Sequence, residues 1–278
     1  MALYMIGDIQ GCHSDFLALL ERMDFSPSRD TLYVLGDLVN RGPDNVGVLQ
    51  TLMGFGSSAV CLLGNHDLHL LAVHAGGAGI KKLDTIQDVL QHRNSAAMLQ
   101  WLSKQHLAWH DHGWLMVHAG VLPSWSIDKT LQLAREVENH ISDSHSGAAF
   151  FKAMYGNQPN HWRDEWQGID RIRAIVNALT RLRFCDAQGH MDFELKEDAS
   201  SAPPHLMPWF DVPNRATAHD RVAFGHWSTL RLASSRHDVL PLDTGCVWGG
   251  TLSAARIDPH TSEVERLECP CQGALQPA

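Results

Sequence analysis

Basic residues are scarce in this sequence, which has 22 Lys and Arg against 31 Asp and Glu and a formal net charge of −9. Proteins that bind nucleic acid or anionic membranes over a broad surface need clusters of Lys and Arg. The composition therefore argues against DNA or a membrane as a partner. It does not exclude a small anionic ligand, because a bound metal can make a local site cationic inside an acidic protein.

Long apolar runs and paired cysteines are missing as well. No uncharged apolar stretch approaches the roughly 18 residues of a membrane helix. The first ten residues, MALYMIGDIQ, lack the basic and apolar regions of a signal peptide. The six cysteines show no paired framework, and Cys269 and Cys271 have no second pair with which to form a zinc site. We therefore expect a soluble, cytoplasmic protein with reduced cysteines.

One local pattern is present, and it occurs five times. Short apolar runs each end in a glycine-polar or histidine-glycine signal, as is typical of a buried strand that leads into a loop. The runs are ALYMI before GD at 7–8, TLYVL before GD at 36–37, AVCLL before GNHD at 64–67, GWLMV before HAG at 118–120 and RVAF before GHW at 225–227. Helical periodicity between the first three runs indicates βαβ units, which place the polar residues at one edge of a sheet.

The segment from 121 to 218 departs from this pattern. It contains two helical stretches, SIDKTLQLAREVENHI and GIDRIRAIVNALTRLRF, and the Pro-rich EDASSAPPHLMPWFDVPN. We predict an α/β core made of residues 1–120 and 219–268. Residues 121–218 are expected to form a mostly helical insertion that caps the sheet edge, and residues 269–278 a loose C-terminal tail.

A mixed set of oxygen and nitrogen donors follows the five predicted strands. The set consists of Asp8, Asp37, Asn65, His118 and His226. Such donors suit Mn²⁺, Fe, Co²⁺ or Zn²⁺ better than Ca²⁺. Each motif alone is explained equally well as a turn at a strand end, but five in this order favour a metal site. Two metals roughly 3.5–4 Å apart need a bridging carboxylate and can share a water acidic enough to serve as hydroxide.

The same motifs resemble the ordered signature of the calcineurin-like metallophosphoesterases. GDIQG, GDLVNRG, GNHD and the histidines of MVHAG and AFGHW carry the resemblance, which covers residues 1–120 and about 219–260. It implies an α/β fold, an αββα sandwich, with a dinuclear metal centre. It also implies roles for individual residues: Asp37 as the bridge, Asp8 and Gln10 at one metal, Asn65, His118 and His226 at the other, His66 as general acid and Arg41 on the phosphate.

Gln10 departs from the family pattern, which usually has His at this position. Its neutral amide oxygen is a weaker ligand, and we hypothesise that the first metal is bound less tightly. His13 is near in sequence, but we expect it to begin the next helix rather than to take the place of Gln10. Asp243 is a candidate to support a metal-bound histidine, because such ligands usually donate their other N–H to a carboxylate or carbonyl.

Asn40 is a second departure, because the protein Ser/Thr phosphatases of this superfamily have Asp at this position. Asn can accept a hydrogen bond from the catalytic His66 but stabilises imidazolium less. Ser and Thr alkoxides are very basic leaving groups (water, a comparable OH, has a pKa of about 15.7) and need a proton from the histidine. A phosphate leaving group has a second pKa of about 6 and needs little help. Asn40 thus favours an anhydride substrate, although drift at this position explains the residue equally well.

Further stretches resemble the bacterial hydrolases of diadenosine tetraphosphate, nearly from end to end. They are GNHDLHLLAV, AMYGNQP, LTRLRFC, AFGHW and LDTGCVWGGTLSA. The resemblance implies cleavage of the central phosphoanhydride of diadenosine tetraphosphate and related dinucleoside polyphosphates to two ADP. It also implies two divalent metal ions, with Mn or Co preferred to Fe or Zn. Tetraphosphate-capped RNA is a further candidate substrate. The alternatives are a protein Ser/Thr phosphatase on the same fold and a non-catalytic nucleotide-binding module.

A polyphosphate substrate requires cations and aromatic rings beyond the metal centre. Arg181 and Arg183 are candidates for the flanking phosphates, because Arg suits bidentate phosphate binding; a solvated helix face is the alternative. Tyr155, Trp162 and Trp248 are candidates to stack on adenine, and burial as structural aromatics is the alternative for each.

Overall fold

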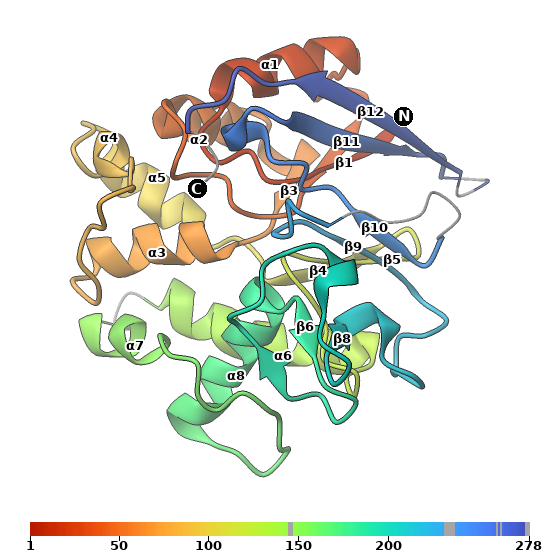
Figure 1. Cartoon of the computed structure of the whole chain (residues 1–278). Coiled ribbons are helices and arrows are strands. Elements are labelled where there is room, and N and C mark those ends of the chain that lie inside the picture. The colour runs from red at the N-terminus through yellow and green to blue at the C-terminus, as the bar shows by residue number, and fades with distance from the viewer. Residues whose placement is uncertain (144–146, 231–236, 260, 262, 276–278) are drawn as a thin grey trace.

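Two β-sheets stacked face to face form the centre of the computed structural model, which describes residues 1–143, 147–230, 237–259, 261 and 263–275 (Figure 1). The first sheet has the order β12-β11-β1-β2-β3 and the second the order β10-β9-β5-β4. The first comprises β1 (Leu3–Ile6), β2 (Thr31–Val34), β3 (Ala59–Cys61), β11 (Thr251–Ile257) and β12 (Val264–Pro270). The second comprises β4 (Ala108–Asp111), β5 (Trp114–Val117), β9 (Arg221–Phe224) and β10 (Val239–Pro241).

The five apolar runs of the sequence form β1, β2, β3, β5 and β9, as predicted. Strands β1, β2 and β3 are parallel to one another, and β5, β9 and β10 are likewise parallel. Between the sheets lies an apolar layer to which Met5 and Tyr33 contribute from the first sheet and Trp114 and Leu240 from the second. Because parallel strands place their carboxyl ends at one edge, the polar residues that follow them are gathered together.

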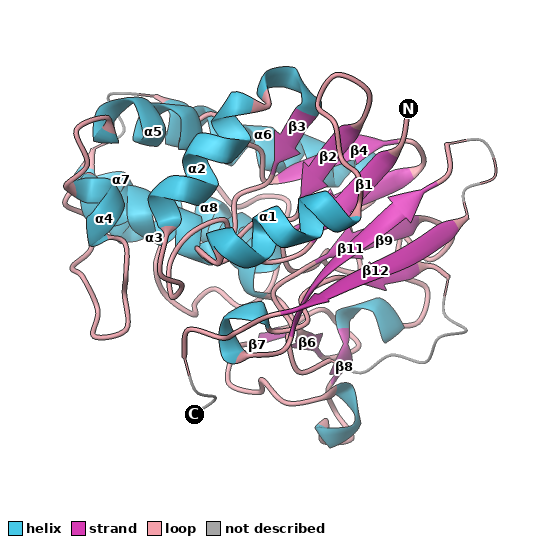
Figure 2. Ribbon diagram, turned by 90° about the horizontal axis from the view of Figure 1, so that it is seen from above, coloured by secondary structure: helices cyan, strands magenta, loops and turns pink. Residues whose placement is uncertain are grey.

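Helices cover the outer faces of both sheets. The α-helices of the described residues are α1 (His13–Arg22), α2 (Asn45–Gly54), α3 (Asn65–His74), α4 (Gln87–Leu90), α5 (Ser95–Leu102), α6 (Ile127–Ser142), α7 (Ala148–Ala153) and α8 (Gly168–Arg181). Helix α1 packs on β11 and β12, and Figure 2 shows α1 and α2 over the five-stranded sheet. Helix α6 packs on β4 and on α8 at the opposite side of the molecule. The predicted αββα sandwich is confirmed.

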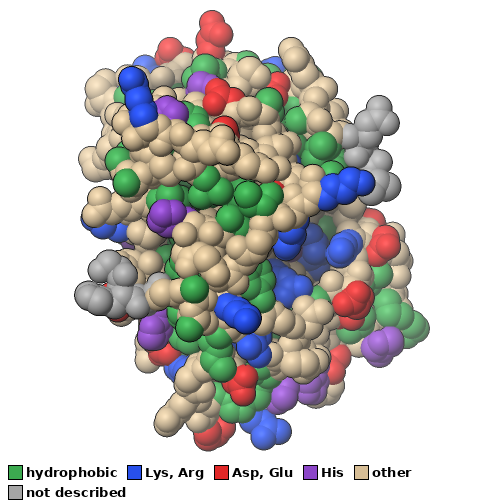
Figure 3. All heavy atoms as spheres, turned by 90° about the vertical axis from the view of Figure 1, so that its left-hand side faces the viewer, with side chains coloured by type: hydrophobic (Ala, Val, Ile, Leu, Met, Phe, Trp, Pro, Cys, Tyr) green, Lys and Arg blue, Asp and Glu red, His purple; other side chains and the backbone are tan. Residues whose placement is uncertain are grey.

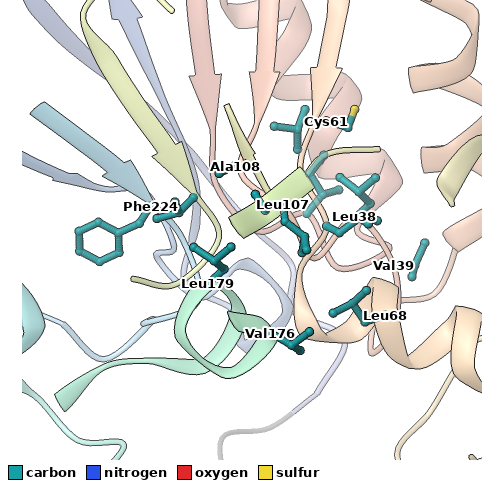
Figure 4. Close-up of a cluster of buried hydrophobic side chains, with 14 of the residues drawn as sticks. Leu38, Val39, Cys61, Leu68, Leu107, Ala108, Val176, Leu179 and Phe224 are labelled. Atoms are coloured by element: carbon teal, nitrogen blue, oxygen red, sulfur yellow. The ribbon is translucent and has the colours of Figure 1, made fainter. Parts of the chain in front are cut away.

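The segment 121–218 is more closely joined to the sandwich than the cap that we expected. Helix α6 supplies part of the outer helical layer, and Val176 and Leu179 of α8 lie in the same buried cluster as Leu68 of α3 and Phe224 of β9 (Figure 4). The segment also holds a small sheet of β7 (Met191–Asp192), β6 (Phe184–Cys185) and β8 (Met207–Pro208). Strands of two residues are too short to leave an alternating pattern in the sequence.

The cysteines and the C-terminal segment differ from the prediction. Cys246 and Cys271 form a disulfide, so the expectation that all cysteines are unpaired is wrong for this pair. Cys246 precedes β11 and Cys271 follows β12, and the antiparallel pairing of Thr251 with Pro270 brings them together. The tail that was expected to be loose from residue 269 is held through residue 275, because the N–H groups of residues 274 and 275 donate to the Val247 carbonyl. Residues 276–278 lie outside the described residues.

No helix within the described ranges is long and apolar enough to span a membrane.

Candidate functional site

The loops after five strands bring the predicted motif residues into contact. Asp8 Oδ1, after β1, accepts a hydrogen bond at 3.0 Å from the N–H of His226, after β9. Asp37 Oδ1, after β2, accepts one at 2.8 Å from the N–H of His66, after β3. Its Oδ2 lies 3.4 Å from Nε2 of His118, after β5. Residues separated by as many as 218 positions thus meet at one edge of the sandwich.

The backbone of this edge is strained where the motifs lie. Five residues have φ in the left-handed region, namely Gln10 (47°), Asp37 (49°), Asn40 (78°), Arg41 (71°) and His226 (62°). Such backbone costs on the order of 1–3 kcal/mol per residue and is concentrated at functional sites. Gly64 and Gly225 are required for a different reason: a Cβ at either position would overlap Oδ1 of Asp37 or Asp8, respectively.

The donor set fits a metal centre. Ligand atoms of Asp37, His118 and His226 lie within 4.8 Å of one another. His118 donates from Nδ1 to the Leu35 carbonyl at 2.8 Å, which leaves Nε2 for a ligand when the ring is neutral. Within the described part of the chain, Nε2 of His118, Nε2 of His226 and Oδ1 of Asn65 are buried without a hydrogen-bond partner. Unpaired buried polar atoms are costly, and a bound cation would satisfy all three.

The structure tests one of the two candidate ligands at this end of the site, His13, but not the other, Gln10. His13 begins α1, as predicted, and its ring nitrogens are occupied by Asp44 and Thr51 at 2.9 Å each. It therefore does not replace a metal ligand. The backbone of Gln10 is fixed by bonds to Asp37 and Gly42, whereas ligation by its side chain remains a prediction.

Charges around Asp37 shift the titration of the whole cluster. Burial alone would raise the pKa of Asp37, but His118 and His66 outweigh it and hold the pKa below its usual value. Burial would lower the pKa of His118, but Asp37 and Asp8 raise it to about 10. Burial, together with nearby Asp243, raises the pKa of Asp8 well above its ordinary value. A metal ion would therefore have to displace protons from this site.

The metal-free protein is expected to lose stability as the pH rises. The pKa of His118 is about 10 in the folded chain and about 6.5 in an unfolded one. Its stabilising contribution is thus fully present below about pH 6.5 and is lost as the pH rises through the folded pKa. The raised pKa of Asp8 acts in the same direction. Thermal unfolding with a chelator should show Tm falling from about pH 6.5 to 9.5, and excess Mn²⁺ should flatten the trend. A metal-free Tm that rises with pH would contradict this.

Asn40 does not play the hydrogen-bonding role that we expected. Its Oδ1 accepts from the N–H groups of Arg41 (2.9 Å) and Thr85 (3.0 Å), which fixes the orientation of the amide. Nδ2 therefore donates, to Asp84 Oδ1 and to His66 Nδ1, at 3.0 Å each. Asn40 is a donor to the histidine, not an acceptor, and it favours the neutral His66 tautomer with its proton on Nε2. Burial, which lowers the pKa of His66, acts in the same direction.

Asp84 and His69 were not predicted from the sequence. The buried Asp84 carboxylate also accepts from Arg41 Nη1 at 3.1 Å and from His69 Nε2 at 2.8 Å. Burial would raise the pKa of Asp84, but hydrogen bonds from the Lys81 N–H and Asn40 outweigh it and hold the pKa at about 2. His69 lies in the run GNHDLHLLAV, one helical turn after His66, and this spacing is the one feature of the sequence that could have indicated its place at the site. Asp84 follows no strand of the repeated pattern and carries no signal of its own.

A cavity of about 290 Å³ adjoins His66. The described residues that line it include Arg41, Asn65, His66, Lys81, Tyr155 and Arg181. Figure 3 shows Lys and Arg side chains gathered around a hollow on the α3 and α7 side of the molecule. The cavity therefore combines cations with a half-exposed aromatic ring, beside the candidate metal ligands.

The two candidate arginines occupy different places. Arg181 lines the cavity and donates to Asn177 and Asn157 at 2.9 Å each. Arg183 is partly buried and donates from Nη2 to the His226 carbonyl at 3.0 Å, while its buried Nε has no partner among the described atoms. Burial lowers the pKa of Arg183, and nearby Asp243 opposes this shift.

The candidate aromatic residues are not all at the site. Tyr155 lines the cavity. Trp162 donates to Asp164 at 2.7 Å and packs edge-on against the buried Trp125, with ring centroids 5.1 Å apart. Trp248 lies in a short 3-10 turn (Cys246–Trp248) and packs against the core. Neither tryptophan is among the described residues that line the cavity. A structural role in packing therefore fits both better than stacking on adenine.

Comparisons with known proteins agree with this geometry. Residues 1–229 match the family model of the calcineurin-like phosphoesterases. The chain is 54% identical to the symmetrical bis(5'-nucleosyl)-tetraphosphatase of Delftia acidovorans over the full length of both. It is 47% identical to that of Nitrosomonas europaea, over 93% of this chain and 96% of the relative.

Solved structures share the fold. The crystal structure of a candidate diadenosine tetraphosphatase superposes with a TM-score of 0.64 at 22% identity, covering 96% of this chain and 93% of the other. A protein serine/threonine phosphatase from Saccharomyces cerevisiae superposes with a TM-score of 0.56 at 12% identity, covering 98% and 80%.

Proposed function

The chain belongs to the calcineurin-like phosphoesterase family, and we propose that it hydrolyses the central phosphoanhydride of diadenosine tetraphosphate and related dinucleoside polyphosphates to two ADP. The observation that carries the proposal is a group of candidate metal ligands, Asp37, His118 and His226, close to a cavity that cations and the Tyr155 ring line. Identity of about half over the full length to symmetrical tetraphosphatases supports the same substrate.

The metal ligands in this proposal are Asp8, Gln10, Asp37, Asn65, His118 and His226. Asp37 would serve as the bridge; its Oδ2 lies 3.4 Å from His118 Nε2 and its Oδ1 accepts from the His66 N–H, which supports this role. When bound, two divalent ions would neutralise phosphoryl oxygens and activate a water molecule. Oxygen and imidazole donors suit Mn²⁺ or Co²⁺.

The remaining side chains bind the substrate and assist the leaving group. Arg41 is oriented by Asp84 and faces the cavity, where it can donate to the attacked phosphoryl group. His66 presents Nε2–H to the departing ADP oxygen. Because a phosphate leaving group has a second pKa of about 6, a hydrogen bond from neutral imidazole suffices. Arg181 and Lys81 neutralise flanking phosphates, and Tyr155 stacks on a base.

Product analysis tests the function directly. The protein is incubated with Mn²⁺ or Co²⁺ and diadenosine tetraphosphate, and the nucleotides are separated by chromatography. We expect ADP alone, with a chelated sample as control. AMP plus ATP would instead indicate asymmetric cleavage. Faster hydrolysis of a phosphopeptide would favour the protein phosphatase alternative, and binding without any product would favour the non-catalytic module. A tetraphosphate-capped RNA in the same assay tests the second candidate substrate.

Gln10→His is expected to tighten the weaker of two metal sites by about tenfold or more, because imidazole replaces a neutral amide oxygen. Calorimetric titration of the metal-free protein with Mn²⁺ should resolve two unequal sites in the natural chain and more similar ones in the variant. His13→Gln is the matched control, since His13 is engaged by Asp44 and Thr51. Two equally tight sites in the natural chain would contradict the hypothesis.

A further inference from the structure

A chain of hydrogen bonds joins the cavity wall to His66 through residues that no sequence motif explains. It begins at the Tyr155 hydroxyl, which lies 2.8 Å from His69 Nδ1. His69 Nε2 lies 2.8 Å from Asp84 Oδ2. Asp84 Oδ1 accepts from Asn40, whose amide also contacts His66. The chain thus runs from the segment 121–218 across α3 to the motif residues after β2 and β3.

The direction of each bond follows from chemistry. A carboxylate only accepts, so His69 must donate to Asp84 from Nε2. Its neutral Nδ1 then accepts from the Tyr155 hydroxyl. The Asn40 amide is already oriented by two backbone N–H groups. With a neutral His69 ring, every bond of the chain thus pairs one donor with one acceptor, and linked bonds of this kind polarise one another.

Asp84 is the branch point of this chain. Besides His69 and Asn40, its carboxylate holds Arg41 Nη1 at 3.1 Å and the Lys81 N–H at 2.6 Å. The same buried anion therefore orients the phosphate-binding arginine and, through Asn40, the histidine beside the leaving group. A shift of Asp84 would displace both.

Tyr155 connects the chain to the substrate. The residue is 37% exposed and lines the cavity, and the Lys81 ammonium lies 5.8 Å from the ring centroid. A nucleoside stacked on the ring can contact one side of Tyr155 while its hydroxyl remains bonded to His69. A substrate too short to reach the ring leaves this end of the chain without a contact.

We propose that His69 and Asp84 are positioning residues that couple occupation of the cavity at Tyr155 to the alignment of Arg41 and His66. This rests on the proposed function, because it takes a dinucleotide as the molecule that fills both the metal site and the cavity. It explains why a buried His–Asp pair lies between the segment 121–218 and the motif residues.

Tyr155→Phe tests the coupling, because it keeps the ring and removes only the hydroxyl. We expect kcat for diadenosine tetraphosphate to fall about five- to tenfold, as loss of one such bond implies, with KM within about twofold. The loss should exceed that on bis(p-nitrophenyl) phosphate by about fivefold. Tyr33→Phe is the matched control, since it also removes a hydroxyl bonded to a carboxylate at 2.8 Å, that of Asp111; its kcat should not change.

His69→Gln completes a double-mutant cycle. The Gln amide retains a donor for Asp84 but has no ring to reach Tyr155. We expect the same loss as for Tyr155→Phe, and no further loss in the double variant. The inference is overturned by multiplicative losses, by an unchanged kcat in Tyr155→Phe, by a change in KM alone, or by equal losses on both substrates. A natural chain that fails to cleave the dinucleotide would overturn the proposed function itself, which distinguishes the two failures.

Discussion

Asp37→Asn is expected to lower kcat for diadenosine tetraphosphate at least about a thousandfold. If Asp37 bridges two metals as proposed, loss of its charge removes metal-derived stabilisation of several kcal/mol. Each factor of ten in rate corresponds to about 1.4 kcal/mol. The side chain also accepts the His66 N–H and faces His118. An amide can keep the first contact but does not supply the negative charge that the proposed metal site requires.

Metal content decides whether this loss has the proposed cause. The variant should bind fewer than two Mn²⁺ ions per chain by elemental analysis after gel filtration. Asp30→Asn is the control, because Asp30 is also a buried carboxylate but is held by Arg29 and the N–H groups of Ala2 and Ser26. That variant should lose stability yet retain the metal content and kcat. Full metal loading of Asp37→Asn would show that Asp37 is not the bridge.

The parts of the molecule that could be predicted are those in which neighbouring residues carry the signal. A strand of apolar residues followed by Gly and a polar residue is local, and β1, β2 and β3 were found in this way. The convergence of Asp8 and Asp37 followed from parallel strands ending at one edge of a sheet. Such an argument needs no knowledge of which distant side chains meet. His118 follows β5 of the second sheet, and its place beside them depends on how the two sheets stack.

Features set by long-range contacts could not be predicted. The pairing of Cys246 with Cys271 depends on the β11–β12 hairpin, whose register the sequence does not state. Helical periodicity identified α6 but not the sheet against which it packs. A tryptophan suits either a base or a core, and the sequence left both roles open for Trp162. The contact that favours the core is with Trp125, 37 residues earlier in the chain, and no local pattern reveals it.

Asn40 shows the same limit within the site. Its identity was readable, and its preference for an anhydride substrate was inferred from an amide that accepts a hydrogen bond. The structure shows that the amide donates, because backbone N–H groups occupy its oxygen and Asp84 faces its nitrogen. The inference about the substrate stays, but its reason changes: Asn40 holds His66 neutral.

Asn40→Asp is accordingly expected to inactivate the enzyme rather than to convert it into a protein phosphatase. The new carboxylate would lie about 3 Å from that of Asp84, and both positions are fully buried. Uncompensated buried charge costs about 3–5 kcal/mol. Displacement of Asp84 would misplace Arg41, so kcat should fall about a hundredfold or more on dinucleotide and phosphopeptide alike.

The pH dependence of unfolding separates charge repulsion from lost packing. Two adjacent carboxylates raise the pKa of one of them above the value of about 3.9 in an unfolded chain. The folded variant therefore retains a proton that the unfolded chain has released. The loss of stability of the Asn40→Asp variant that is due to charge repulsion is absent below about pH 4, and it grows as the pH rises towards the raised pKa. A difference in Tm from the natural chain that is the same at pH 5 and pH 8 would contradict repulsion.

The exchanged pair, Asn40→Asp with Asp84→Asn, provides the decisive comparison. The carboxylate is then at position 40 and faces an amide at position 84. Arg41 and His69 contact this neutral amide instead of the Asp84 carboxylate. We expect it to recover stability relative to Asn40→Asp but not kcat, since Arg41 loses its anion and His66 gains an acceptor for Nδ1–H. Phosphopeptide hydrolysis that exceeds that of the natural chain would show that the charge state of the histidine, and not the shape of the cavity, selects the anhydride. If the variant hydrolyses neither substrate, activity depends on the alignment of Arg41 by Asp84 rather than on the charge state of the histidine.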